Sequence, residues 1–129
     1  MAGRISRRLL TEYIADRLVA GDATVIEQLA AYLIEIRRTK EVDLYVRDIE
    51  YALIDRGVVV ADVTSAHHLA AETQEAVTRF LSTAYAAKTV ELRQSLDASL
   101  IGGINIQTAD AEYDTTVKRK ITNLQKMKV

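Results

Sequence analysis

Residues 97–106 read Asp97-Ala-Ser-Leu-Ile-Gly-Gly-Ile-Asn-Ile106. Asp97 and Ser99 favour a turn, because short polar side chains bond to the nearby backbone. Two glycines follow, and they permit backbone angles or a close approach of another segment that a side chain forbids. Ile104 and Ile106 are two residues apart, which places both on one side of a strand. The stretch therefore predicts a turn that leads the chain into a strand.

The segments on both sides of this stretch predict a small β-α-β-β-α domain. A β-branched run at residues 58–64 predicts a strand, and helical spacing returns over residues 73–84. Apolar residues on even positions over residues 90–96 indicate another strand before the turn. After the strand that follows the turn, residues 111–113 allow a short return strand, and Asp114 is a candidate cap for a last helix.

Helical spacing accounts for the first half of the chain. Apolar residues recur three and four positions apart and predict helices over residues 6–19, 24–38 and 42–56. Gly57 is the expected left-handed stop of the last of these helices. The predicted fold class is therefore α+β, with a short N-terminal helical bundle of about three helices at residues 1–57 and the β-α-β-β-α domain at residues 58–129.

The composition is that of an ordinary globular protein. The chain has 129 residues, 49% of them hydrophobic and 27% charged, and its net charge of −1 provides no global field for nucleic acid or a membrane. It has no cysteine, which excludes disulfides and Cys-based zinc sites. No stretch approaches the roughly 18 apolar residues of a membrane span, and the first residues lack the apolar core of a secretory signal. We expect a cytoplasmic protein whose link to any membrane is made through a partner.

Three blocks of the second half resemble one known family. They are Val59-Val-Ala-Asp-Val-Thr-Ser-Ala66, the 97–106 stretch, and Asp114-Thr-Thr-Val-Lys-Arg-Lys-Ile-Thr-Asn-Leu124. In this order and at these separations they are similar to the delta subunit of the F-type ATP synthase, which is called the oligomycin-sensitivity-conferring protein in mitochondria. The resemblance covers residues 33–129. The chain departs from the family's pattern at His67-His68, at Asp110, and in having a shorter helical part than the family's six-helix bundle.

The resemblance implies a stator subunit and not an enzyme. The helical domain would bind the N-termini of the alpha subunits at the catalytic head, and the second domain would hold the C-terminal end of the b subunit of the peripheral stalk. The protein would resist the torque of proton- or sodium-driven ATP synthesis at the cytoplasmic face of a bacterial membrane, without inserting into it. The family has no catalytic, cofactor or metal-binding residues, so the resemblance implies none here.

Candidate partner-binding residues combine the resemblance with the apolar pattern. Apolar residues surround more than half of the second and third helices, which is more than three short helices bury against one another. A partner helix fills the resulting groove, or the second domain or another copy of the chain covers it. The candidates in the helical domain are Leu9, Tyr13, Tyr45 and Ile49, and those facing the stalk are Leu100, Ile101 and Leu124. The residues expected to shape the backbone are Gly57, Asp97, Gly102, Gly103 and Asp114.

Other patterns leave an alternative function open. The last 15 residues contain five Lys or Arg and no acid, which suits a solvated helix end but also a small RNA-binding module. Against RNA stand the neutral charge and the lack of exposed strand aromatics for stacking bases. A stalk adaptor of another rotary or secretion ATPase is a third interpretation. His67 and His68 point to opposite faces of an extended segment, and residues 110–114 lack the ligand spacing of a calcium loop, so no metal site is predicted.

Overall fold

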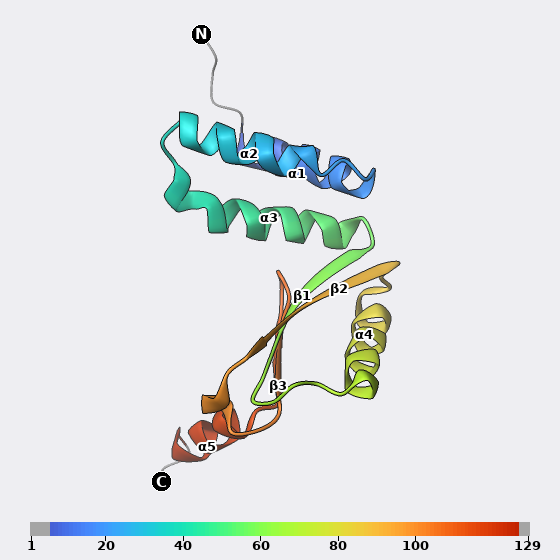
Figure 1. Ribbon diagram of the computed structural model, residues 1–129, viewed down its shortest axis with the longest axis vertical. Helices are drawn as coiled ribbons and strands as arrows, with labels where there is room; N and C mark the ends of the chain where they lie inside the picture. The colour runs from blue at the N-terminus through green and yellow to red at the C-terminus, as the bar shows by residue number, and fades with distance from the viewer. Residues whose placement is uncertain (1–5, 127–129) are drawn as a thin grey trace. The chain divides into compact units, whose positions relative to one another are not determined.

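The computed structural model describes residues 6–126, apart from the side chain of Val117. The chain divides between Val58 and Val59 into two compact units, called unit 1 and unit 2 (Figure 1). Unit 1 is helical, and unit 2 combines a sheet with helices. The α+β fold class predicted from the sequence is confirmed.

Unit 1 consists of α1 (Arg7–Val19), α2 (Thr24–Glu35), the 3-10 helix η1 (Thr39–Glu41) and α3 (Val42–Asp55). α1 packs mainly against α3, and each α-helix contributes one buried stripe. The buried residues recur three and four positions apart, as expected of amphipathic helices. They are Thr11, Ile14 and Ala15 of α1, Val25, Leu29 and Leu33 of α2, and Tyr45, Ile49, Ala52 and Leu53 of α3.

α2 ends at Glu35, before the predicted end near Arg38. Arg37 takes a left-handed φ of 58°, and the Arg38 amide donates to the carbonyl oxygen of Leu33 at 2.8 Å. Together with the bond from the Arg37 amide to the oxygen of Ile34, this closes a Schellman-type helix end. The predicted boundary is wrong because an arginine here adopts the conformation that usually marks a glycine.

Unit 2 is built on one sheet of four strands in the order β2-β1-β3-β4. The strands are β1 (Val58–Ser65), β2 (Thr89–Leu96), β3 (Ile104–Gln107) and β4 (Glu112–Asp114). α4 (Ala71–Tyr85) joins β1 to β2, the 3-10 helix η2 (Ala98–Leu100) precedes β3, and α5 (Val117–Lys126) follows β4. The predicted β-α-β-β-α order is present, and the possible return strand at residues 111–113 forms β4, shifted by one residue.

The strand directions follow from the pairing. β3 runs antiparallel to both β1 and β4, with Ile106 opposite Val63 and Tyr113. β1 and β2 run parallel, because Asp62 contacts Arg93 and Thr64 contacts Ser95, so that the partner numbers rise together. The sheet is therefore mixed, and α4 forms the crossover between its two parallel strands.

Thr108 fixes the hairpin between β3 and β4. Its amide donates to the carbonyl oxygen of Ala111 at 2.8 Å, and its hydroxyl donates to the Asp110 carboxylate at 2.9 Å. The Tyr85 hydroxyl also donates to Asp110, which ties the end of α4 to this turn. Side-chain oxygens thus stabilise a hairpin that has no glycine at its turn.

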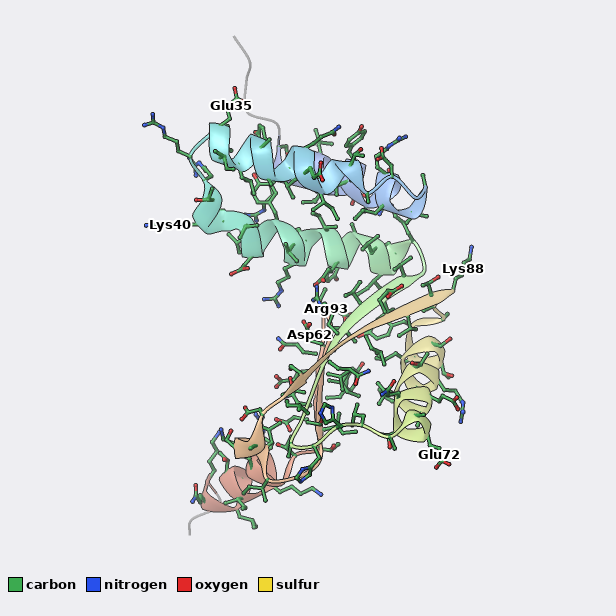
Figure 2. The ribbon with its side chains drawn as sticks, in the orientation of Figure 1. Glu35, Lys40, Asp62, Glu72, Lys88 and Arg93 are labelled. Atoms are coloured by element: carbon green, nitrogen blue, oxygen red, sulfur yellow. The ribbon has the colours of Figure 1, made fainter. Side chains whose placement is uncertain are left out.

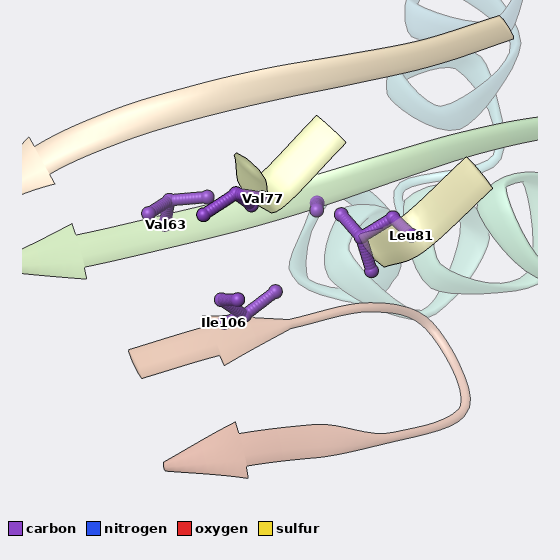
Figure 3. Packing of buried hydrophobic residues seen from close by; sticks show 5 residues of the cluster. Val63, Val77, Leu81 and Ile106 are labelled. Atoms are coloured by element: carbon purple, nitrogen blue, oxygen red, sulfur yellow. The ribbon is translucent and has the colours of Figure 1, made fainter. Parts of the chain in front are cut away.

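The core of unit 2 lies between α4 and one face of the sheet. Buried apolar side chains from β1, α4 and β3 meet there, and Figure 3 shows them. They are Ala61, Val63, Val77, Leu81 and Ile106. The alternate residues of β1 point the other way, and Asp62 forms an exposed ion pair with Arg93 of β2 at 2.7 Å (Figure 2). The strand alternation therefore gives the sheet one apolar face and one polar face.

Candidate binding surfaces

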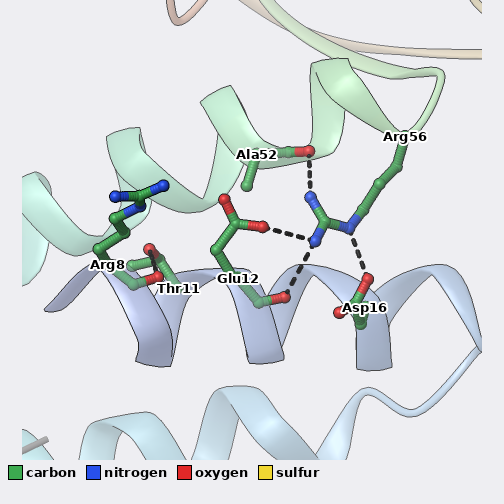
Figure 4. Close-up of polar contacts among 6 residues, drawn as sticks. All are labelled: Arg8, Thr11, Glu12, Asp16, Ala52 and Arg56. Atoms are coloured by element: carbon green, nitrogen blue, oxygen red, sulfur yellow. Dashed lines mark hydrogen bonds and ion pairs between the residues drawn. The ribbon is translucent and has the colours of Figure 1, made fainter. Parts of the chain in front are cut away.

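Arg56 holds α1 against the end of α3 (Figure 4). Its guanidinium donates to Glu12 Oε2 at 2.7 Å, to Asp16 Oδ1 at 2.6 Å and to the carbonyl oxygen of Ala52 at 2.8 Å. Hydrogen bonds to Asp16 and Glu12 raise the pKa of Arg56, and the bond from Arg56 lowers the pKa of Asp16. Because Glu12 and Asp16 lie one turn apart on α1, the network sets which face of α1 is exposed.

We expect Arg56→Met to lower the melting temperature of unit 1 near neutral pH, because methionine retains apolar packing but removes both ion pairs. The pKa of Asp16 is depressed in the folded state. Its stabilising contribution is therefore present above the unfolded aspartate pKa of about 3.9 and is lost as the pH falls through the folded value. Thermal melts should show a smaller difference between the two proteins at acidic than at neutral pH. An equal difference at both would contradict the role of the carboxylates.

Leu9 and Tyr13 form an exposed apolar pair on α1. Their side chains are 67% and 54% exposed, and their four-residue spacing places them together on the side opposite the buried stripe. α2 has a similar outward pair, since Ile26 is 56% and Ile34 is 64% exposed. The α2 pair is absent from the candidates named from the sequence, although the extra width of the α2 stripe is the signal that indicates it. Unit 1 therefore exposes apolar side chains on α1 and α2, and α3 also exposes Val42, Leu44, Val46 and Tyr51.

Tyr45 and Ile49 do not belong to this exposed set. They are 5% and 7% exposed, and they lie on the buried side of α3. The same side carries Ala52 and, one turn later, Arg56, which contacts α1 directly. The sequence-based candidates Tyr45 and Ile49 are thus corrected to core residues, because the α3 stripe to which they belong faces the other helices.

The turn after β2 places an apolar side chain at the end of unit 2. The Asp97 carboxylate accepts hydrogen bonds from the hydroxyl of Ser99 at 2.7 Å and from its amide at 3.0 Å, and these bonds lower the pKa of Asp97. Beyond η2 the Gly102 amide donates to the oxygen of Leu100 at 2.7 Å, while Ile101 takes a φ of 70° and a ψ of −47°. This is a γ-turn with a positive φ, which is rare and strained, and a β-branched residue occupies its centre.

Gly103 is the glycine of this stretch that the fold requires. Its φ is 83°, whereas Gly102 has no positive φ. A Cβ on Gly103 would meet the carbonyl oxygen of Thr115 and would lie 2.8 Å from the Cα of Thr116. The absence of a side chain therefore lets the start of β3 pass directly beside the residues that begin α5.

Thr116, and not Asp114, is the capping residue of α5. The Thr116 hydroxyl accepts a hydrogen bond from the Arg119 amide at 3.1 Å, the geometry of a helix N-cap. Asp114 lies one step earlier and accepts from both the amide and the hydroxyl of Thr116, which lower its pKa. The sequence-based assignment of the cap to Asp114 is therefore corrected, because its carboxylate orients the threonine that caps the helix.

The stalk-facing candidates differ in their accessibility. Ile101 is 60% and Leu124 is 68% exposed, whereas Leu100 is partly buried. Ile121 was not among the stalk-facing candidates predicted from the sequence. It is 43% exposed and lies three residues before Leu124 on the same side of α5. η2 packs against α5, so these elements together form one end of unit 2.

Within residues 6–126, the structure contains no group of three or more His, Cys, Asp or Glu side chains that could hold a metal ion. His67 and His68 are both exposed. None of the helices in this range is long and apolar enough to cross a membrane.

The fold and its surfaces define a helical unit joined to an α+β unit, with exposed apolar side chains on each. Residues 6–127 match the family described as ATP synthase delta (OSCP) subunit, and the chain belongs to that family. The family predicted from the sequence is confirmed.

Curated relatives carry the name ATP synthase subunit delta, and one solved structure shares the fold. The ATP synthase subunit delta of Rhodobacter capsulatus is 41% identical over 70 residues, which cover 54% of this chain and 37% of that protein. The subunit delta of Rhodopirellula baltica is 39% identical over 83 residues, or 63% of this chain and 36% of that protein. The matched stretch thus spans little more than a third of these relatives. A chain in the cryo-EM structure of the Toxoplasma gondii mitochondrial ATP synthase hexamer shares the fold, with a TM-score of 0.63, 13% identity, and coverage of 95% of this chain and 69% of that one.

Proposed function

We propose that this chain is a non-catalytic stator subunit that links the catalytic head of an F-type ATP synthase to its peripheral stalk. The helical domain at residues 1–57 binds N-terminal segments of the alpha subunits, and residues 58–129 hold the C-terminal end of the b subunit. The protein works at the cytoplasmic face of the membrane and resists the torque that accompanies proton- or sodium-driven ATP synthesis. It contributes binding and rigidity and performs no chemical step.

The separate apolar surfaces of the two units are the observation that supports this proposal. A linker needs two sites that two partners occupy at once, and each unit exposes large apolar side chains on helices or on the turn beside a helix. On unit 1 they include Leu9 and Tyr13, whose four-residue spacing matches the anchors of helix-in-groove recognition. On unit 2 they include Ile101 and Leu124. Apolar side chains that become buried when a partner binds provide most of the affinity in protein interfaces.

Calorimetry with two synthetic peptides from the same organism tests the proposal. The alpha peptide is the N-terminal segment of the alpha subunit, and the b peptide is the C-terminal segment of the b subunit. We expect Leu9→Ala/Tyr13→Ala to weaken the binding of the alpha peptide by about tenfold or more. The affinity for the b peptide should stay unchanged. Ile101→Ala/Leu124→Ala should do the reverse, so each double variant is the control for the other. Failure of the wild-type chain to bind either peptide would contradict the proposal.

RNA binding, the alternative function, receives no support from the aromatic side chains of unit 2. Tyr113 of β4 packs edge to face against Phe80 of α4, with ring centroids 5.2 Å apart and an interplanar angle of 89°. The Tyr85 hydroxyl is bonded to Thr108 and Asp110. The polar face of the sheet displays Asp62 and Arg93 instead. Stacking of bases on strand aromatics, the usual basis of sheet-mediated RNA binding, therefore has no platform among these residues.

A further inference from the structure

β2 is an edge strand whose outer side is open. It stands first in the order β2-β1-β3-β4, so β1 is its only neighbour in the sheet. Its outer side therefore carries a row of backbone N–H and C=O groups that no strand of the sheet bonds. None of the backbone hydrogen bonds in the turns and loops of residues 6–126 involves β2. Six of its eight residues are exposed.

The usual protections of an exposed sheet edge are weak on β2. Natural proteins shorten their edge strands, interrupt them with proline or a bulge, or place charges on them. β4, the other edge, has three residues, whereas β2 has eight, and the chain contains no proline. β2 does carry Glu91 and Arg93, but these two charges have opposite signs. A second strand of the same sequence therefore meets attraction at this edge when it is aligned correctly.

The two faces of β2 carry different side chains. Val90 and Leu92 pack against the core beneath α4. Arg93 lies on the other face, where its Nε and Nη2 donate to the carboxylate of Asp62 at 2.7 and 3.0 Å. Glu91 lies on this polar face too, since it is two residues from Arg93, and it forms no ion pair within residues 6–126. β2 thus presents a central leucine on one face and two opposite charges on the other.

An open groove runs between α4 and the apolar face of β2. Leu92 and Gln94 of β2 line it from the sheet, and Gln74, Thr78 and Ser82 are among the α4 residues that line it from the helix. A further strand paired with β2 would place its side chains beside Leu92, in this groove. The helix therefore leaves room for the sheet to continue past its edge.

Antiparallel pairing of β2 with a second copy of itself has few possible registers. Because side chains alternate between faces, residues that lie opposite each other must belong to the same face, so their numbers have an even sum. Two registers give the longest overlap, one pairing residues 90–96 and the other residues 89–95 of each copy. The first places Arg93 opposite the second copy's Arg93. The second places Leu92 opposite Leu92, and Glu91 of each copy opposite Arg93 of the other, so the charges favour it.

Arg93 can bond a second carboxylate without leaving Asp62. A guanidinium has five N–H donors, and Arg56 of this chain bonds Glu12 and Asp16 together, at 2.7 and 2.6 Å. Residues directly opposite each other in an antiparallel pair have Cβ atoms about 5 Å apart, within reach of long side chains. A two-fold axis at the centre of the pairing repeats each contact. The register therefore gives two cross-strand ion pairs.

We propose that β2 is a self-association surface, at which two copies of this chain pair their edges and join their sheets into one. Leu92 meets its counterpart at the two-fold axis, beneath the α4 helices, and the pairs between Glu91 and Arg93 flank the axis on the polar face. A second copy fits this edge better than an unrelated strand, because β2 is complementary to itself in charge. The inference goes beyond the proposed function and does not depend on it.

Charge reversal tests the self-association with a readout that misfolding cannot imitate. Glu91→Arg places arginines opposite each other, and Arg93→Glu places glutamates opposite each other. Each variant alone should weaken the dimer of the full chain by about tenfold in sedimentation equilibrium, because two attractive pairs become repulsive. An equimolar mixture of the two should restore the dimer, since every arginine then faces a glutamate. The matched control, Glu112→Arg, makes the same change on β4 and should have no effect.

Cysteine substitution measures the register itself, because the chain has no cysteine of its own. In the proposed register the two copies of residue 92 lie opposite each other with Cα atoms about 5 Å apart, a separation that a disulfide spans. Leu92→Cys should therefore form a disulfide-linked dimer under mild oxidation. Gln94→Cys, on the same face, should not, because the two copies of residue 94 are offset by about 13 Å along the strands.

Three results would overturn the self-association of β2. The first is a wild-type chain that stays monomeric up to about 1 mM, where even a weak dimer is half formed. The second is a dimer that ignores both charge variants or loses its mass in Leu9→Ala/Tyr13→Ala, which would place the contact on unit 1. The third is oxidation of Gln94→Cys as fast as that of Leu92→Cys. None of these results affects the proposed function, which the alpha and b peptides test separately.

Discussion

Replacing Gly103 by alanine should destabilise unit 2 by about 3 kcal/mol and release α5 from its position. The new methyl group would meet the carbonyl oxygen of Thr115 and lie 2.8 Å from the Cα of Thr116, and its residue would be held at a φ of 83°. Both neighbours are backbone, so no side chain can turn away to make room. Thr116 is 1% exposed and caps α5, so a shift of this segment disturbs the helix itself.

Gly21→Ala is the matched control for this substitution. Gly21 has a φ of 90°, yet a Cβ there has no neighbour within 4 Å. This variant should therefore lose only about 1 kcal/mol of unfolding free energy, which is the cost of the left-handed conformation for alanine. Urea denaturation gives the two free energies of unfolding, and hydrogen exchange of the α5 amides reports its release. If Gly103→Ala costs no more than Gly21→Ala, the close approach of β3 to the start of α5 is contradicted.

Leu81→Ala should cost unit 2 about 3 kcal/mol, because it empties the centre of its core. Leu81 is 0% exposed and packs with Val63, Val77 and Ile106 between α4 and the sheet (Figure 3). The remaining cavity cannot close completely, since α4 and the strands are held by their other contacts.

Phe80→Ala provides the control from the adjacent position. It removes a larger side chain, but Phe80 is 46% exposed, and its ring contact with Tyr113 contributes about 1 kcal/mol. We therefore expect the smaller substitution, Leu81→Ala, to have the larger effect on the free energy of unfolding in urea. The reverse order would show that α4 presents a different face to the sheet.

Local patterns predicted the elements of unit 2 because its sequence signals agree with its packing. The two-residue spacing of Ile104 and Ile106 indicates β3, and Ile106 is buried in the core as the alternation requires. The short polar residues Asp97 and Ser99 form the predicted turn. In this part of the chain, local preference and tertiary structure favour the same conformation.

The wrong end of α2 arises because an unexpected residue takes a glycine-like conformation. Arg37 ends α2 with a φ of 58°, so this stop is not visible in the sequence. Ala86 ends α4 in the same way with a φ of 50°, although there the helical spacing itself stops at residue 84, next to the observed end. At the turn before β3, Ile101 takes a positive φ beside two glycines. Asp114 and Thr116 are both residue types that cap helices well. Only the hydrogen bond from the Arg119 amide to the Thr116 hydroxyl identifies the threonine as the N-cap of α5.

The binding surfaces were predicted less completely than the fold. Apolar residues surround much of α2 and α3, so spacing alone could not separate the buried Tyr45 and Ile49 from outward residues such as Ile34. Which side chains are exposed depends on which helices pack together. The hydrogen bonds from Arg56 to Glu12 and Asp16 are long-range contacts that help to decide which face of α1 is exposed. The resemblance to the delta subunit supplied the proposed partners, and burial in the structure selects the residues that are free to meet them.

Simultaneous binding of the two partners is the most direct test of a head-to-stalk linker. Native mass spectrometry of the chain with the alpha peptide and the b peptide measures it in a single experiment. The proposed function predicts a ternary complex in which one chain holds both peptides, and Leu9→Ala/Tyr13→Ala should remove only the alpha peptide from it. Competition between the peptides for one site, or binding of neither, would contradict the linker.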